Sequence, residues 1–253
     1  MEPWNNVIPL SRSAARPVAL EVQLGEYRRA FTEWTPDQGR VFQAFYAIDT
    51  ETTEIDRENP QIVPALVLAT ACDETRGVLL SRNTLPAFLR IHHDSSLICH
   101  NAAFDLKVMQ QVIGKGQDLY ELVELGRVWD TLVLRRLLSL ATQGHAARGD
   151  STLAASVRDI LGLELPKETE DEQGKAIRTG FGRYLGRPLS EIPFDSLSYA
   201  ARDPLATWLL FWKLYAQIKA ALRDSTQVWG YVNESWLADC IRRFGPLTHH
   251  VQL

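Results

Sequence analysis

The sequence predicts an α/β domain with a mixed β-sheet, and three observations support this prediction. Three apolar segments joined by short loops lie within residues 41–81 and indicate an antiparallel meander. After residue 84, short apolar strands alternate with segments of helical spacing, which is typical of an α/β fold. With 253 residues and 45% apolar content, the chain is long enough to bury a full core.

The first part of the chain is expected to consist mostly of strands. Residues 18–22 read as a strand, and residues 27–34 read as a short helix. The first segment of the meander, 41–48, is rich in aromatic and β-branched residues. The other two segments, 65–71 and 78–81, are separated by a polar loop that is typical of a hairpin.

The second part is expected to alternate. Short strands are predicted at 96–100 and 128–129, and helices at 85–91, 102–112, 131–140, 152–161, 194–222 and 236–244. Asn101 is placed to cap the helix that follows it. The apolar residues of 131–140 are spaced as in a buried helix, whereas 164–194 reads as an irregular excursion.

The charge balance restricts the class of function. The chain has 27 Lys and Arg against 31 Asp and Glu, which gives a formal net charge of −4. This balance argues against indiscriminate coating of nucleic acid. It does not argue against a nuclease, because carboxylates that hold divalent cations add negative charge themselves.

Membrane insertion, secretion and disulfide bonding are not predicted. The longest near-continuous apolar run, residues 63–71, is shorter than the roughly 20 residues that span a bilayer. The first residues lack a basic segment followed by an apolar one, so they do not read as a signal peptide. The three cysteines are far apart, which disfavours a disulfide framework or a cysteine zinc site. We therefore expect a cytoplasmic protein.

An acidic pair follows the best predicted strand. Asp49 and Glu51 are two residues apart, so their side chains point to the same face of the strand. Neighbouring carboxylates repel unless a proton or a cation bridges them, and a hard cation such as Mg²⁺ or Mn²⁺ is the simplest solution. The alternative is a solvated strand end. Asp56 and Glu58 form a second such pair, which we interpret as a solvated loop because no apolar strand precedes it.

Two further elements carry acids. Asp105 falls in the first turn of a helix that follows Asn101, where helix capping and dipole chemistry alone would also explain it. Tyr199 and Asp203 are four residues apart and share one face of a helix, which an ordinary amphipathic helix would also produce.

Together, and in this order, the three elements resemble the motifs of the DEDD superfamily of 3′–5′ exonucleases. The motifs read here as Tyr46–Thr52, His100–Asp105 and Tyr199–Asp203, and the resemblance covers roughly residues 41–222. Ser198 stands where the sister branch has His, so the chain is similar to the tyrosine branch. That branch includes the proofreading domain of family A DNA polymerases, ribonuclease D and the Werner-type exonucleases.

The resemblance implies a fold and a division of the chain. The fold is ribonuclease H-like, an α/β arrangement with a mixed five-stranded central sheet, antiparallel meander then parallel strands, flanked by helices. The exonuclease domain would span 41–222, with an N-terminal extension at 1–40 and a C-terminal helical tail at 223–253.

The resemblance also implies a two-metal mechanism. Two divalent cations, Mg²⁺ or Mn²⁺, would be held by four carboxylates and would activate water and stabilise the attacking and leaving oxygens. Asp49 would bridge both ions, Glu51 and Asp203 would complete the site of the ion that activates water, and Asp105 would support the second ion. Tyr199 would orient the water, because a phenol with a pKa near 10 is a poor base at pH 7.

Substrate contacts are expected from further residues. Ile55 matches the family's wedge against the terminal bases, and Phe104 matches a position near the terminal nucleotide, although it would serve equally as a core residue. Arg178, Arg183 and Arg187 would track phosphates or lie in a solvated loop. The remaining expected contacts are backbone groups around Thr50 to Thr52, and Asn101 and Arg148.

Three functions are compatible with these motifs. The first is an exonuclease that degrades single-stranded DNA from its 3′ end to nucleoside 5′-monophosphates, with a role in DNA repair or proofreading. The second acts on RNA or short oligonucleotides, as ribonuclease D does. The third is a proofreading-like module that binds nucleic acid or docks on a polymerase or another replication partner. The intact acids favour an active enzyme, and DNA is favoured over RNA.

Overall fold

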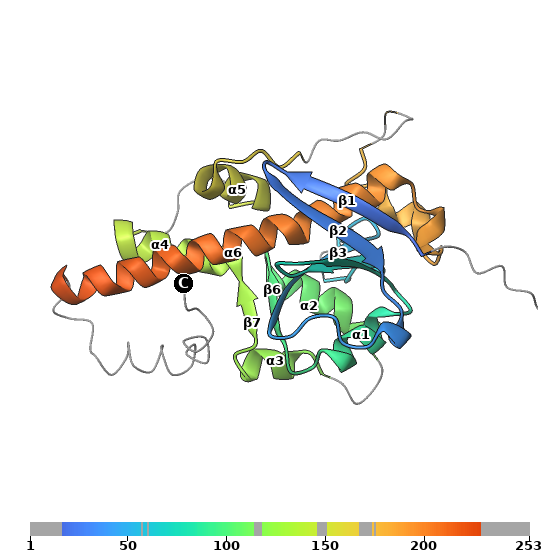
Figure 1. Cartoon of the computed structure of the whole chain (residues 1–253), viewed down its shortest axis with the longest axis horizontal. Helices are drawn as coiled ribbons and strands as arrows, with labels where there is room; N and C mark the ends of the chain where they lie inside the picture. The colour runs from blue at the N-terminus through green and yellow to red at the C-terminus, as the bar shows by residue number, and fades with distance from the viewer. Residues whose placement is uncertain are drawn as a thin grey trace, which may run out of the picture.

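The computed structural model describes residues 17–56, 58–59, 61–113, 118–145, 151–166, 174 and 176–228, with side chains up to residue 221. Within these residues the chain forms a mixed seven-stranded sheet covered by helices on both faces (Figure 1). The predicted α/β fold with a mixed sheet is therefore confirmed. The expected helix at 236–244 lies outside the described residues.

The centre of the sheet is the predicted meander. β4 pairs antiparallel with both β3 and β5, whereas β6 and β7 add parallel strands beyond β3. These five strands correspond to the five that were expected. The bounds in spatial order are β1 (Ala19–Leu24), β2 (Tyr27–Glu33), β5 (Gly77–Ser81), β4 (Leu66–Cys72), β3 (Phe45–Thr52), β6 (Ser96–Cys99) and β7 (Val128–Asp130).

The prediction of a helix over residues 27–34 is wrong, because this segment is strand β2. Gly25, in the left-handed region at φ 59°, allows a tight turn that pairs β2 antiparallel with β1. β2 then joins the meander as a parallel neighbour of β5. The fit there is close: a Cβ on Gly77 would lie 2.4 Å from the ring of Phe31. The strand expected over residues 18–22 is present as β1, so β1 and β2 extend the expected five-stranded central sheet to seven strands.

Helices form a layer on each face of the sheet (Figure 1). One layer holds α1 (Leu85–Ile91), α2 (Ala102–Gln110) and α3 (Tyr120–Glu124); the other holds α4 (Thr131–Gln143), α5 (Leu153–Leu161) and α6 (Phe194–Val228). Short 3-10 turns occur at Pro36–Gln38, Phe181–Tyr184 and Leu189–Glu191. Each layer encloses its own apolar core against the sheet.

Helix α4 is present but is not buried as predicted. Only Thr131 and Ser139 are buried in it, whereas Val133, Leu137 and Leu140 are about half exposed. These three side chains are spaced four and three residues apart, so they form one apolar stripe on the helix. The apolar spacing predicted the helix correctly, and Leu134 and Leu138 pack against the core under α6, but the stripe beside them is exposed.

Two further expectations concern cysteines and membranes. Cys72 and Cys99 are both buried and free, whereas Cys240 lies outside the described residues. No helix in the described part of the chain is long and apolar enough to cross a membrane.

Candidate active site

The alternation of side chains along β3 distributes the first motif between the two helix layers. Phe45 and Ala47 belong to the core under α6, whereas Tyr46 and Ile48 belong to the core under α2. By the same period of two, Asp49 and Glu51 face α6, and Thr50 faces α2. A single strand thus presents its acids to one helix and a hydroxyl to another.

Asp203 on α6 meets the acidic pair of β3. One carboxylate oxygen from each of Asp49, Glu51 and Asp203 lies within 4.8 Å of the other two. Glu51 and Asp203 are buried, and Asp49 is half-buried. Three carboxylates at this spacing repel one another strongly without a cation between them. Oxygen ligands of this kind suit Mg²⁺ or Mn²⁺, so these residues fit a hard divalent cation.

Asp105 lies next to this group but is held from the other layer. It is 3% exposed, and the Thr50 hydroxyl donates a hydrogen bond to its Oδ1 at 2.7 Å. Burial raises the pKa of Asp105 to about 7; the bonds from Thr50 oppose this shift, and Asp130 and Asp203 add to it. The structure therefore brings three of the four acids together and places the fourth beside them, close enough for Asp203 to affect its protonation.

The start of α2 is held by Asp130. The expectation that the Asn101 side chain caps this helix is wrong, because Asn101 is exposed, adopts φ 76° and makes no capping bond. Instead the Asp130 carboxylate accepts hydrogen bonds from the backbone N–H groups of Asn101 and Ala102 at 3.1 and 2.9 Å. It also accepts from two N–H groups at the start of α4. One carboxylate thus fixes the first turns of two helices.

Tyr199 is 3% exposed and lies close enough to the acids for the charges of Asp203, Glu51 and Asp49 to raise its pKa. Its pKa is raised far above the usual value, first by burial and then by the charges of Asp203 and Glu51, whereas Arg178 lowers it. The phenol therefore stays protonated at neutral pH and is able to donate a hydrogen bond. The ring centroids of Phe181 and Tyr199 are 6.1 Å apart, so the turn Phe181–Tyr184 packs against the Tyr199 side of the site.

The expected substrate contacts are placed unevenly. Ile55 is 49% exposed, as a wedge would be, and Phe104 is partly buried against the α2-side core. The hydroxyl of Thr52 donates to the carbonyl of Thr53, and that of Thr50 is committed to Asp105. Arg148 lies outside the described residues. The second acidic pair, Asp56 and Glu58, is an exposed loop, in agreement with its interpretation.

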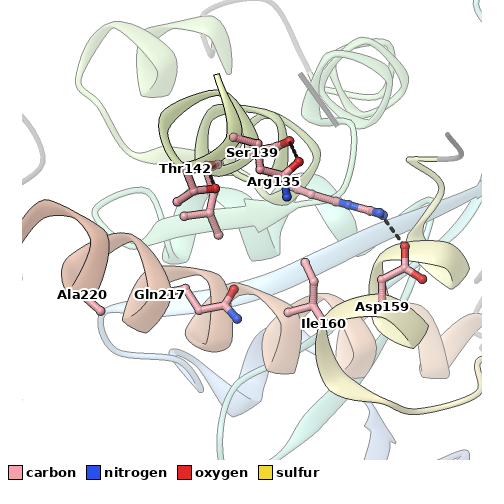
Figure 2. A pocket seen from close by; sticks show the side chains of 9 residues that line it. Arg135, Ser139, Thr142, Asp159, Ile160, Gln217 and Ala220 are labelled. Carbon is pink, nitrogen blue, oxygen red and sulfur yellow. Dashed lines mark hydrogen bonds and ion pairs between the residues drawn. The ribbon is translucent and has the colours of Figure 1, made fainter. Parts of the chain in front are cut away.

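A cavity of about 560 Å³ lies elsewhere, between α4, α5 and α6 (Figure 2). Arg135 crosses it and donates hydrogen bonds to Asp159 and Ser156 at 2.6 Å. None of the four candidate acids lines this cavity. The acids gather instead at the carboxyl end of β3, so we place the candidate active site there.

Comparisons with known proteins agree with this fold. Residues 41–219 match the family model described as 3′–5′ exonuclease. The EXO domain of Nibbler from Aedes aegypti shares the fold, with 16% identity, 70% of this chain and 80% of that chain covered, and a TM-score of 0.51. Ribonuclease D from Trypanosoma brucei is also similar, with 17% identity, 71% of this chain and 58% of that chain covered, and a TM-score of 0.49. NrnC from Brucella melitensis is similar with 17% identity, 72% of this chain and 77% of that chain covered, and a TM-score of 0.48. No curated protein matches significantly.

The fold and the acids define a ribonuclease H-like nuclease that uses divalent metal ions. The family match covers well over half of the chain, and the chain belongs to the 3′–5′ exonuclease family of the DEDD superfamily. It is therefore an enzyme with a nucleic acid substrate. The predicted domain boundaries at residues 40 and 222, and the cytoplasmic location, stay predictions.

Proposed function

We propose that this enzyme belongs to the tyrosine branch and removes nucleotides from the 3′ end of single-stranded DNA, releasing nucleoside 5′-monophosphates. The observation that carries the proposal is the convergence of Asp49, Glu51 and Asp203 near the buried phenol of Tyr199, whose pKa their charges raise. Phosphodiester hydrolysis needs positive charge near an anionic phosphate, and these carboxylates are placed to hold it.

The acids have distinct parts in this proposal. Asp49, Glu51 and Asp203 would hold the cation that activates water, and Asp49 would also contact a second cation supported by Asp105. When bound, the two cations lower the pKa of water and balance the charge on the phosphate. Thr50 fixes one oxygen of Asp105 and so orients that carboxylate toward the carboxyl end of β3.

Tyr199 would orient the attacking water through its hydroxyl. Because burial and nearby acids keep the phenol protonated, it acts as a donor and not as a base. The packing of Phe181 on the ring restricts where the hydroxyl points. Arg178, a cation of the excursion over residues 164–194, lowers the pKa of Tyr199 through its charge. This proximity supports a phosphate contact of Arg178 near Tyr199.

Tyr199→Phe is expected to lower kcat by about 10-fold or more and to leave the Mg²⁺ concentration for half-maximal activity within twofold, because only the hydroxyl that orients water is lost. Tyr184→Phe, in the adjacent turn, serves as the matched control and should retain kcat. Measurements at saturating oligonucleotide check this prediction. An unchanged kcat for Tyr199→Phe would remove the phenol from the mechanism.

DNA is proposed as the substrate because hydroxyls next to the acids are already engaged. Thr50 bonds Asp105 and Thr52 bonds a backbone carbonyl, so neither donates to a sugar 2′-hydroxyl. Ile55, exposed three residues after Thr52 and its bulge with Glu51, would wedge against the terminal bases. A polymerase or other replication partner stays a prediction.

The deciding experiment compares matched DNA and RNA oligonucleotides, each with a free or a blocked 3′ end and a 5′ label. We expect stepwise shortening of single-stranded DNA from a free 3′ end, dependent on Mg²⁺ or Mn²⁺ and lost in EDTA. Faster shortening of RNA, or of very short oligonucleotides, would establish the ribonuclease alternative. Equal loss of blocked strands would contradict exonuclease polarity altogether.

A further inference from the structure

Helix α6 contains a proline one residue after Asp203. Pro204 has no backbone N–H, so it cannot donate the helical hydrogen bond to the carbonyl four residues earlier, which is that of Ala200. Ala200 is fully buried, and an unpaired buried carbonyl is destabilising. The helical turn that carries both Tyr199 and Asp203 therefore lacks the backbone hydrogen bond from residue 204 to the carbonyl of Ala200.

Thr70 supplies the missing donor from the sheet. Its hydroxyl donates to the carbonyl of Ala200 at 2.9 Å, across 130 residues of sequence, and Thr70 is fully buried. On β4, Thr70 is the direct cross-strand partner of Asp49 on β3. Directly opposed residues of antiparallel strands point to the same face, which here is the face under α6. One hydroxyl therefore joins the strand position beside Asp49 to the helical turn between Tyr199 and Asp203.

We propose that Thr70 is a positioning residue that, through the carbonyl freed by Pro204, sets the spacing of the Tyr199–Asp203 turn from the acids of β3. This inference rests on the proposed assignment of Asp49 and Asp203 as metal ligands. Sites that hold divalent cations tolerate errors of only about 0.5 Å in ligand placement. A bond that fixes the helix to the sheet at this turn therefore acts on cation affinity and on turnover, and not on general stability alone.

The experiment is a double-variant cycle. Thr70→Val keeps the volume but removes the donor, and we expect kcat to fall about 10- to 100-fold and the half-saturating Mg²⁺ concentration to rise, as for other residues that orient metal ligands. The KM for the oligonucleotide should change little. Thr70→Ser, which keeps the hydroxyl, should retain most of the activity.

Pro204→Ala supplies an N–H that pairs the carbonyl of Ala200 within the helix, but it does not tie the helix to the sheet. In that background Thr70→Val should lose less stability, yet kcat should still fall about 10- to 100-fold relative to Pro204→Ala. Thr207→Val is the matched control: Thr207 is buried one turn beyond Asp203, and its hydroxyl has no hydrogen-bond partner among the described residues. It should leave kcat and Mg²⁺ dependence unchanged.

Several results would overturn the proposal. It fails if folded Thr70→Val has wild-type kcat and Mg²⁺ dependence, or if Pro204→Ala restores both in Thr70→Val, because the hydroxyl would then only satisfy the carbonyl and not set the spacing of the helix. Should Thr70→Val not fold alone, it must fold in the Pro204→Ala background, and failure in both contradicts the proposal. Activity that survives Asp203→Ala would instead reject the proposed metal site, so the two failures are distinguishable.

Discussion

Replacing either Asp49 or Asp203 by Ala is expected to abolish turnover, with a fall of at least about a thousand-fold, or roughly 4 kcal/mol in transition-state stabilisation. Each substitution removes one of three carboxylates that lie within 4.8 Å of one another. The remaining two cannot hold a cation in the same position, and the negative charge on the phosphate is then unbalanced. Single-turnover rates on a 5′-labelled single strand measure the effect.

The same variants should remain folded, because they relieve repulsion between buried acids. Asp195→Ala is the matched control: Asp195 lies exposed in the first turn of the same helix α6, away from the acidic group, and its loss should leave the rate unchanged. Wild-type rates for both Asp49→Ala and Asp203→Ala would refute the assignment of the site.

The stability of the metal-free protein is expected to fall between pH 4 and pH 7 because of Asp105. In the folded protein the pKa of this carboxyl is raised from 3.8 to about 7, first by burial. The folded state therefore binds the proton more tightly than the unfolded state does. The stability that this group contributes is fully present below pH 3.8 and is lost as the pH rises through about 7.

A shift of about three pKa units corresponds to roughly 4 kcal/mol in the free energy of unfolding. Denaturant titrations of wild type and Asp105→Asn in EDTA at pH 5 and pH 8 cover roughly 3 kcal/mol of this change, because part of the loss occurs below pH 5. The amide keeps an acceptor for Thr50 but does not titrate, so the variant should lose most of this pH dependence. An identical pH dependence in the two proteins would show that Asp105 is not the group responsible.

The sequence predicted the centre of the fold well, because its signals are local. The strands β3 to β7 are contiguous apolar segments, and their order along the chain nearly determines the sheet. The segment 27–34 was misjudged because Tyr27, Phe31 and Trp34 are spaced as on a helix face. What decides its conformation is pairing with β1 through Gly25 and with β5, which are tertiary contacts.

The motifs predicted the acids, three of which the structure gathers together, but they did not predict the residues that hold these acids in place. The residues that hold them act across long stretches of chain: Thr50 holds Asp105, and Thr70 holds the carbonyl of Ala200. Pro204 inside a predicted helix was the available signal, because a proline there leaves a backbone carbonyl without its helical N–H donor and so indicates a donor from another element. Nothing local identifies which of the chain's hydroxyls supplies it.

The β1–β2 hairpin has a consequence for how the molecule is assembled. The hairpin is synthesised before the meander, and its partner strand β5 follows some 45 residues later. The hairpin therefore cannot pair with the sheet until β5 has formed. Shortening the chain to the matched residues 41–219 would remove β2 and leave the backbone of β5 unpaired at the edge of the sheet. It would also expose Gly77, against which the ring of Phe31 packs. Such an edge recruits strands from other molecules, so the shortened enzyme would tend to aggregate.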